Sequence, residues 1–539
     1  MKVDRPHIPG LSDVGQLAQL PGVMCEWESI AGRGPRTRNR TGGFQPFCWL
    51  VLLLAAVAGT SGAEFAPSSL RPPTVQRELR GAWIASVKNI DWPSKPGLSA
   101  AQQQAELVAI LDRCAQLHLN AAFFQVRPAC DALYESQLEP WSECLTGTMG
   151  RSPGYDPLAF AVREARRRGL ELHAWFNPFR ARRSGATGPV AREHISKTRP
   201  SLVKSYGTSL WLDPGERDVQ DHSLRVVLDV VRRYDVDGVH FDDYFYPYEE
   251  KDRQGRPLPF PDDSSWKRYV AGGGRLGRED WRRENVNRFV RQVQETVHGL
   301  KPWVRFGISP FGIWRPGYPP SVKGLDAYDT LYADSRRWLV EGWVDYLAPQ
   351  LYWPANAPEQ SFPALLKWWT EQNGRQRHVW AGVSHRNGME EIVRQIKLTR
   401  TQPGASGEIH WSAKALGIEQ RSEADALRRE VYAEPALAPA FPWLDNTPPA
   451  QPGLNVTADA RGGTKANWSN NGAEAAWLWV LQTRSGGAWR TEILPAGQTS
   501  RAWTGKDAPE ALALTAVDRC GNASAPVVLE KRPDAPARR

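Results

Sequence analysis

The sequence lacks the features that mark several common non-enzymatic classes of protein. Its 539 residues include only six cysteines, too few for a fold held together by disulfide bonds. No tract of five or more consecutive Lys or Arg residues occurs, and 68 basic residues stand against 59 acidic ones, a net charge of +9. Nucleic acid is therefore not expected as a partner.

Long apolar runs are also nearly absent, with one exception near the N-terminus. Residues 47–58 read FCWLVLLLAAVA, which is short for a membrane span. Four arginines precede this run, and Ser61-Gly62-Ala63 supplies the small residues that a signal peptidase needs. We expect residues 1–63 to be a signal peptide with an upstream extension; a buried helix or a membrane anchor are the alternatives.

Such a leader predicts an exported protein, in a periplasm or outside the cell, with no stable membrane span after its removal. Export also allows disulfide bonds. Cys130 and Cys144 lie in one loop-like segment, where they could pair or remain free thiols. The sequence gives no oligomeric state.

Tryptophan is abundant, with 24 residues. Indole rings either fill a core or stack on flat apolar faces, including those of sugars, and composition does not choose between the two roles.

Strand-like apolar runs alternate with helix-period segments between residues 77 and 432. The runs are Gly81–Val87, Ala121–Val126, Leu170–Phe176, Val236–Phe241, Arg305–Ser309, Val344–Gln350, His378–Ser384 and Gly407–Ser412. Eight such units are the number that closes a parallel barrel. A doubly wound open sheet is the competitor, but no glycine-rich phosphate loop follows the first run. We predict an α/β fold, a (β/α)8 TIM barrel over residues 77–432.

The composition changes after this segment. Residues 433–452 are rich in proline and indicate an ordered, stiff linker. Residues 453–532 show short alternating runs separated by turn residues, which predict a small β-sandwich. We expect the sandwich to be dispensable for chemistry, so that a chain ending near Phe441 keeps its activity.

Function in such a barrel gathers where strands end and βα loops begin. The fourth run ends in DGVHFDDYFYPY. His240, Asp242 and Tyr244 share one face of an extended strand, and Asp243 should point the other way. Asp242 is therefore the first candidate for a nucleophile or general base, with Asp243 second. The alternative is a carboxylate that caps a helix or pairs with an arginine.

A glycosidase needs a second carboxyl group. Asp131 follows the second strand most closely and is the first choice as partner of Asp242. Glu135, Glu139 and Asp91 are the other candidates on neighbouring edges. A turn or salt bridge within the loop is the structural alternative for Asp131.

No metal or other cofactor is expected. A barrel metallohydrolase would place a His pair at the end of the first strand, and that strand reads GAWIASV. The histidines of the barrel are then hydrogen-bonded core residues or partners of sugar hydroxyls.

Aromatic and hydrogen-bonding side chains crowd the same strand ends. Aromatic rings stack on the C–H faces of pyranose rings, although core packing should claim about half of them. The candidate substrate-binding residues are Arg127, Tyr134, Trp175, Asn177, Arg180, His240, Tyr244, Trp314, Gln350, Tyr352 and Trp353.

Several segments resemble the glycosyl-hydrolase-like family 10 proteins. They are RGAWIASVKNIDWPS, VRPACDALYESQLEPWSECLTG, GYDPLAFAVREARRRGLELHAWFNPFRA, DGVHFDDYFYPY, FGISPFGIWRPG and YADSRRWLVEGWVDYLAPQLYWP. The resemblance implies a (β/α)8 barrel, carbohydrate hydrolysis and export in bacteria, in some cases with a link to cell-wall glycan. It places FDDYFY, and so Asp242 and Asp243, at the active site. The tail, with AVDRCGNASAP, is similar to fibronectin type III-like modules.

The expected function is thus an exported glycoside hydrolase acting on a polysaccharide, with bacterial cell-wall glycan as a candidate. A non-catalytic carbohydrate-binding barrel and a metal-dependent amide hydrolase are the alternatives.

Overall fold

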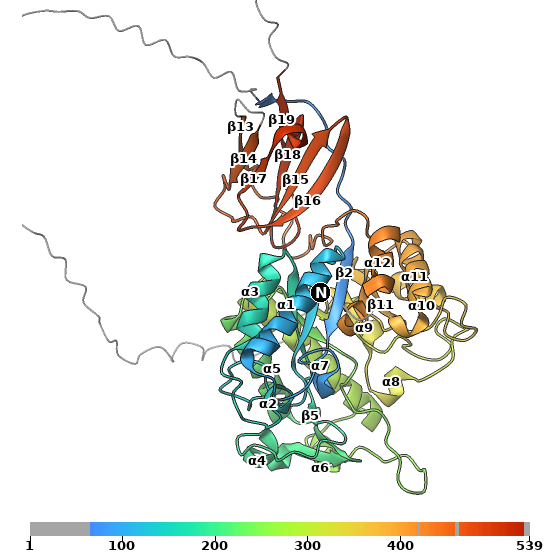
Figure 1. Cartoon of the computed structure of the whole chain (residues 1–539). Coiled ribbons are helices and arrows are strands. Elements are labelled where there is room, and N and C mark those ends of the chain that lie inside the picture. The colour runs from blue at the N-terminus through green and yellow to red at the C-terminus, as the bar shows by residue number, and fades with distance from the viewer. Residues whose placement is uncertain (1–64, 418–420, 459–462, 533–539) are drawn as a thin grey trace, which may run out of the picture. The chain divides into compact units, whose positions relative to one another are not determined.

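A computed structural model describes residues 65–417, 421–458 and 463–532 (Figure 1). Eight parallel strands close into a barrel in the order β10-β11-β12-β2-β3-β4-β8-β9, which confirms the predicted TIM barrel. The strands are β2 (Leu79–Ile84), β3 (Ala121–Arg127), β4 (Glu171–Phe176), β8 (Gly238–Phe241), β9 (Arg305–Ile308), β10 (Tyr346–Leu347), β11 (His378–Ser384) and β12 (Ala405–Trp411). The predicted signal peptide and its extension, residues 1–63, lie outside the described residues.

Helices follow the strands around the barrel. The longer ones are α1 (Ala100–Gln116), α3 (Pro157–Arg167), α5 (Arg217–Arg233), α7 (Arg278–Leu300), α10 (Phe362–Glu371), α11 (Met389–Thr401) and α12 (Arg421–Glu430). The order Asp156-Pro157 predicts the start of a helix, and α3 begins there, with Pro157 in its first turn and the Asp156 side chain accepting a hydrogen bond from the Ala159 N–H at 2.8 Å. In the described part of the chain, no helix is both long and apolar enough to cross a membrane.

The apolar period of residues 330–340 predicts a single helix, and this prediction is wrong. The structure has two short helices there, α8 (Ala327–Thr330) and α9 (Ser335–Glu341). Tyr332, between them, adopts a left-handed φ of 52°, and the Asp334 side chain accepts from the Arg337 N–H to start α9. The apolar period is thus shared by two helices that a turn separates.

Side chains that point inward fill the barrel. Phe123, Tyr346, Trp380 and Ile409 belong to one buried cluster inside it. Ring size dictates glycine on two strands, because a Cβ on Gly307 would lie 2.1 Å from the Tyr346 ring, and one on Gly238 would lie 2.2 Å from the His173 ring. Those rings occupy the centre and leave the C-terminal end of the barrel open for a site.

The proline-rich segment 433–452 is more than a spacer. Phe441 is fully buried and belongs to the cluster inside the barrel, with Leu79 and Trp380. The guanidinium of Arg305 lies 4.7 Å above its ring. Ending the chain near Phe441, as the sequence suggested, would remove the floor of the barrel, so a truncation that tests the sandwich must keep this residue.

We expect Phe441→Ala to lower the free energy of unfolding by about 3–5 kcal/mol, because it leaves a cavity in a closed core. Chemical denaturation of the full chain measures this loss. Pro442→Ala is the matched control, because Pro442 is exposed. Equal stability of the two variants would show that the segment does not support the barrel.

Two antiparallel sheets follow and share a core, as the prediction of a small β-sandwich requires. The five-stranded sheet has the order β1-β19-β18-β15-β16, and the three-stranded sheet the order β13-β14-β17. Their strands are β1 (Phe65–Pro67), β13 (Gly453–Ala458), β14 (Thr464–Ser469), β15 (Leu478–Ser485), β16 (Ala488–Pro495), β17 (Ser500–Trp503), β18 (Ala511–Val517) and β19 (Val527–Lys531). Strands β14, β16 and β17 were not predicted, nor was β1, whose residues precede the barrel but pair with β19.

The four cysteines of the described residues are free and buried. Cys130 and Cys144 therefore do not pair; the Cys130 sulfur instead accepts a hydrogen bond from Arg127 at 3.2 Å.

Candidate active site

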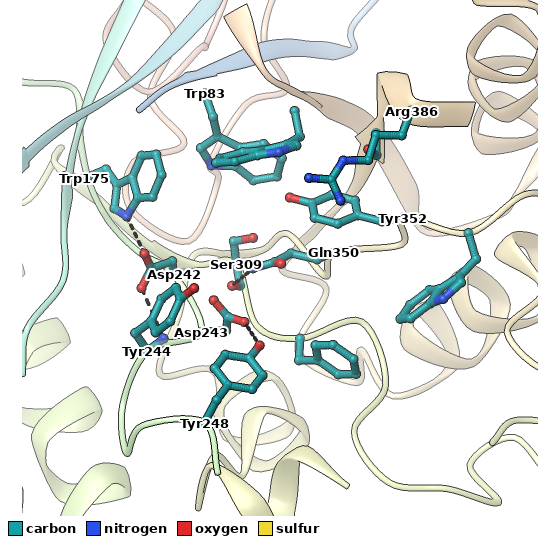
Figure 2. A pocket seen from close by; sticks show the side chains of 14 residues that line it. Trp83, Trp175, Asp242, Asp243, Tyr244, Tyr248, Ser309, Gln350, Tyr352 and Arg386 are labelled. Carbon is teal, nitrogen blue, oxygen red and sulfur yellow. Dashed lines mark hydrogen bonds between the residues drawn. The ribbon is translucent and has the colours of Figure 1, made fainter. Parts of the chain in front are cut away.

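A pocket of about 420 Å³ opens at the C-terminal ends of the barrel strands (Figure 2). It holds two carboxyl groups, Asp242 and Asp243, one cation and a large share of aromatic rings. The lining residues are Trp83, Trp175, Asp242, Asp243, Tyr244, Tyr248, Ser309, Phe311, Gln350, Tyr352, Trp353, Ser384, Arg386 and Trp411.

Aromatic rings form one end of this pocket. The ring centroids of Trp83 and Trp411 are 6.1 Å apart, and Tyr352 stacks on Trp411 at 6.5 Å. Trp175 contacts the same group, 6.2 Å from Trp411. Flat apolar faces beside carboxyl groups are suited to a pyranose ring.

Asp242 follows β8 directly, and three N–H groups fix its carboxylate. Oδ2 accepts from Trp175 Nε1 at 3.0 Å and from Asn177 Nδ2 at 2.5 Å, and Oδ1 accepts from the Tyr244 backbone N–H at 3.2 Å. The amide of Asn177 cannot turn over, because its Oδ1 accepts from Gln125 and from Arg180, each at 2.7 Å. Asp242 therefore presents a fixed carboxyl group to the pocket, as its position on the strand predicted.

Asp243 also lines the pocket, and the expectation that it points away is wrong. Strand β8 ends at Phe241, so the alternation of an extended strand no longer holds at residue 243. The chain turns there, with the Phe245 N–H donating to the Asp243 carbonyl. The Tyr248 hydroxyl donates to the Asp243 carboxylate, and Figure 2 shows this bond below Asp242.

Burial makes both neighbouring carboxyl groups harder to ionise. Burial, followed by the charge of Asp243, raises the pKa of Asp242 to about 7, and burial also raises the pKa of Asp243. Arg180 opposes this shift at Asp242, as do the hydrogen bonds from Tyr244 and Asn177. Asp242 is therefore partly protonated near neutral pH.

His240 does not line the pocket; it lies beneath it, fully buried. Its Nε2 lies 3.0 Å from the Trp83 indole nitrogen, which can only donate, so the ring is neutral with its proton on Nδ1. Nδ1 then donates to the Tyr346 hydroxyl at 3.1 Å, and that hydroxyl donates to His173 at 3.0 Å. Burial lowers the pKa of His240. The prediction that it binds substrate is thus corrected: it holds Trp83 in place.

Asp131, predicted as the second catalytic carboxyl group, does not line the pocket either. It is buried in the loop after β3, where it accepts from the Ala129 N–H at 2.8 Å. Burial raises its pKa to about 6. It stabilises the loop, which is the structural alternative that the sequence left open.

Four other predicted binding residues also lie outside the pocket. Arg127 is buried in an ion pair with Glu139, and Tyr134 is fully buried in the core. Trp314 stacks on Trp368 and donates to Asp334. Arg180 acts through Asn177, and its guanidinium lies 4.7 Å from the Tyr244 ring centre.

Asn177 also lies outside the pocket, where its side-chain amide donates a hydrogen bond to the Asp242 carboxylate. The remaining predicted binding residues line the pocket: Trp175, Tyr244, Gln350, Tyr352 and Trp353.

Half of the pocket lining was not predicted from the sequence. Trp83, Ser309, Ser384 and Trp411 lie in barrel strands or directly after them, so the inward alternation could have identified them. Phe311, Tyr248 and Arg386 lie in loops, where the sequence carries no such signal.

Carboxyl groups also meet away from this pocket. Among the described residues, Asp445, Glu474 and Asp518 are close enough together to share a cation, although only Glu474 of the three is exposed. None of the three lines the pocket.

Comparisons with known proteins give the chain its relatives. It is 41% identical over 404 residues to glycosyl hydrolase YngK of Bacillus subtilis, covering 72% of this chain and 78% of that protein. It is 35% identical over 419 residues to glycosyl hydrolase DigH of Escherichia coli, covering 70% and 93%. The glycoside hydrolase domain of PgaB from Bordetella bronchiseptica is 14% identical, with a TM-score of 0.41 over 66% of this chain and 99% of that one.

A family model described as glycosyl hydrolase-like 10 matches residues 78–397, which include the whole pocket except Trp411. Together with the two relatives, this match shows that the chain belongs to the glycosyl hydrolase-like 10 family.

Proposed function

We propose that this protein is an exported glycoside hydrolase that cleaves a glycosidic bond in a polysaccharide, with bacterial cell-wall glycan as the first candidate substrate. The observation that carries the proposal is the pair Asp242 and Asp243 in an aromatic pocket at the C-terminal end of the barrel. Paired carboxyl groups beside a bound sugar are the usual machinery of glycoside hydrolysis.

The raised pKa gives the two carboxyl groups separate roles. Asp242, whose pKa of about 7 keeps it partly protonated near neutral pH, donates a proton to the leaving oxygen. Asp243 then carries the negative charge that stabilises the oxocarbenium-like transition state and activates the attacking group. From the sequence, Asp242 was expected to be the nucleophile or base; its environment supports the opposite assignment.

Export and the cell-wall substrate rest on the sequence. The apolar run at residues 47–58, followed by Ser61-Gly62-Ala63, supports a leader. The names of YngK and DigH, both glycosyl hydrolases, support the reaction class. N-terminal sequencing of exported protein should find a chain that begins at Glu64.

The reaction is tested by release of reducing ends. The mature protein is incubated with purified cell-wall glycan and with neutral polysaccharides, with and without EDTA. We expect new reducing ends, unaffected by the chelator. Binding without new reducing ends would favour a carbohydrate-binding barrel, and loss of activity with EDTA would favour a metal-dependent hydrolase.

The assignment of Asp242 as acid predicts a pH dependence. Activity needs its protonated form, so kcat/KM should fall as pH rises through about 7. Arg180→Gln removes a positive charge that favours the carboxylate, so the pKa of Asp242 rises and this alkaline limb moves to higher pH.

The pH profile of kcat/KM measures the shift. Arg182→Gln is the control, because Arg182 lies on the same short strand, β5 (Arg180–Arg182), but donates to the Gly188 carbonyl. A limb that stays in place in Arg180→Gln, or moves to lower pH, would contradict the assignment.

A further inference from the structure

Arg386 is the one positively charged residue among the described residues that line the pocket. It lies in the turn His385–Asn387, directly after β11. Within the described part of the chain, its guanidinium forms no hydrogen bond, ion pair or ring contact. Arg386 is exposed at the edge of the pocket, and a cation there with no such contact among the described residues is available to a ligand.

The backbone that carries Arg386 is nevertheless fixed. On one side, His385 Nε2 is hydrogen-bonded to His410 Nδ1 at 3.1 Å. On the other, Asn387 Nδ2 donates to the Tyr352 carbonyl at 3.2 Å. The hydrogen bonds of these two neighbours therefore fix the backbone of Arg386 at the edge of the pocket.

The position of Arg386 gives the pocket two oppositely charged sides. Figure 2 shows its guanidinium beside Tyr352, across the pocket from Asp242 and Asp243. No ion pair joins it to either carboxyl group in the described structure. The space between them is lined by aromatic rings and by Ser309, whose buried Oγ has no hydrogen-bond partner among the described residues.

This charge pattern bears on the substrate. A negatively charged sugar would be repelled by the carboxyl pair unless a cation held its charge at the far side. Arg386 is in that place, and a guanidinium binds a carboxylate through two parallel hydrogen bonds. A neutral sugar gains no such contact.

We propose that Arg386 binds a carboxylate carried by a sugar of the glycan. It thereby selects acidic glycans and determines in which of its two orientations a glycan binds beside Asp242 and Asp243. This inference rests on the proposed function and deepens it. The substrate class is then a polysaccharide with free carboxylate substituents close to the bond that is cleaved.

The test compares two substrates that differ only in charge. One is soluble cell-wall glycan with free carboxyl groups, and the other is the same glycan with those groups reduced to primary alcohols. We expect reduction to lower kcat/KM of the wild type by about 10- to 100-fold, the usual effect of a charge-assisted hydrogen bond.

Arg386→Gln should lower kcat/KM on the acidic glycan by the same factor and have no further effect on the reduced glycan. Arg386→Lys should recover part of the loss, because it keeps the charge without the planar fork. Arg394→Gln on the following helix α11 is the control, because Arg394 does not line the pocket. Equal losses on both glycans, or no loss on the acidic one, would overturn the inference.

A binding measurement distinguishes failure of this inference from failure of the proposed function. The acidic and the reduced oligosaccharides are each titrated against two proteins, Asp242→Asn alone and Asp242→Asn combined with Arg386→Gln. Tighter binding of the acidic form that Arg386→Gln abolishes supports the inference even if no cleavage is found. Equal affinity of Asp242→Asn for the two forms contradicts it, whatever the wild type cleaves.

Discussion

Asp242→Asn is expected to lower kcat by about 10²- to 10⁴-fold, the usual contribution of a general acid. The amide keeps the shape of the side chain and can still accept from Trp175 and Asn177, but it has no acidic proton to give. Substrate affinity should change little. Kinetics on purified glycan oligosaccharides measure the loss.

Substrates whose leaving groups differ in acidity test whether Asp242 is the general acid. With aryl glycosides of the same oligosaccharide, the loss in Asp242→Asn should shrink as the leaving phenol becomes more acidic, because such a group departs without a proton. A loss that is independent of the leaving group would show that Asp242 is not the acid. A variant with full activity would remove it from the mechanism.

Asp243→Asn is the second substitution with a large expected effect, again about 10²-fold or more in kcat. Its carboxylate stabilises positive charge and activates the attacking group, so the loss should persist with every leaving group. Added azide or formate should restore part of the rate by replacing the missing anion. If neither anion restored the rate of Asp243→Asn, and if its loss in kcat shrank with more acidic leaving groups, Asp243 would be the general acid and Asp242 the charged partner.

The double variant extends this test. Because the two residues act as one unit, removing both should cost little more than removing either. Losses that multiply would indicate that Asp242 and Asp243 work independently. Thermal unfolding of each variant separates these losses from damage to the fold.

The barrel could be predicted because its signals are local and repeated. Each strand is a short apolar run, and helix α3 has its cap and its proline in sequence order. The alternation along the fourth strand predicted Asp242 at the rim. Even β10, which is only two residues long, falls inside a predicted run.

The rest of the site depends on contacts between distant residues. Asp243 lies in the pocket because β8 ends at Phe241, so that the alternation of side chains stops before residue 243. The sequence carries no clear signal for the end of a strand. Asp131 turns away because its loop folds back on itself, with bridges such as the one between Ala132 and Trp141. Arg386 reaches the pocket from a turn after β11 that periodicity cannot orient.

The central claim is that the scissile bond lies beside Asp242 and Asp243. The most direct measurement is a crystal structure of Asp242→Asn with a bound glycan oligosaccharide. We predict a glycosidic oxygen within hydrogen-bond distance of the residue 242 side chain, with the adjacent sugar ring against Trp83 or Trp411. A glycan bound elsewhere on the protein, or one whose glycosidic oxygens all lie out of reach of both carboxyl positions, would contradict the account.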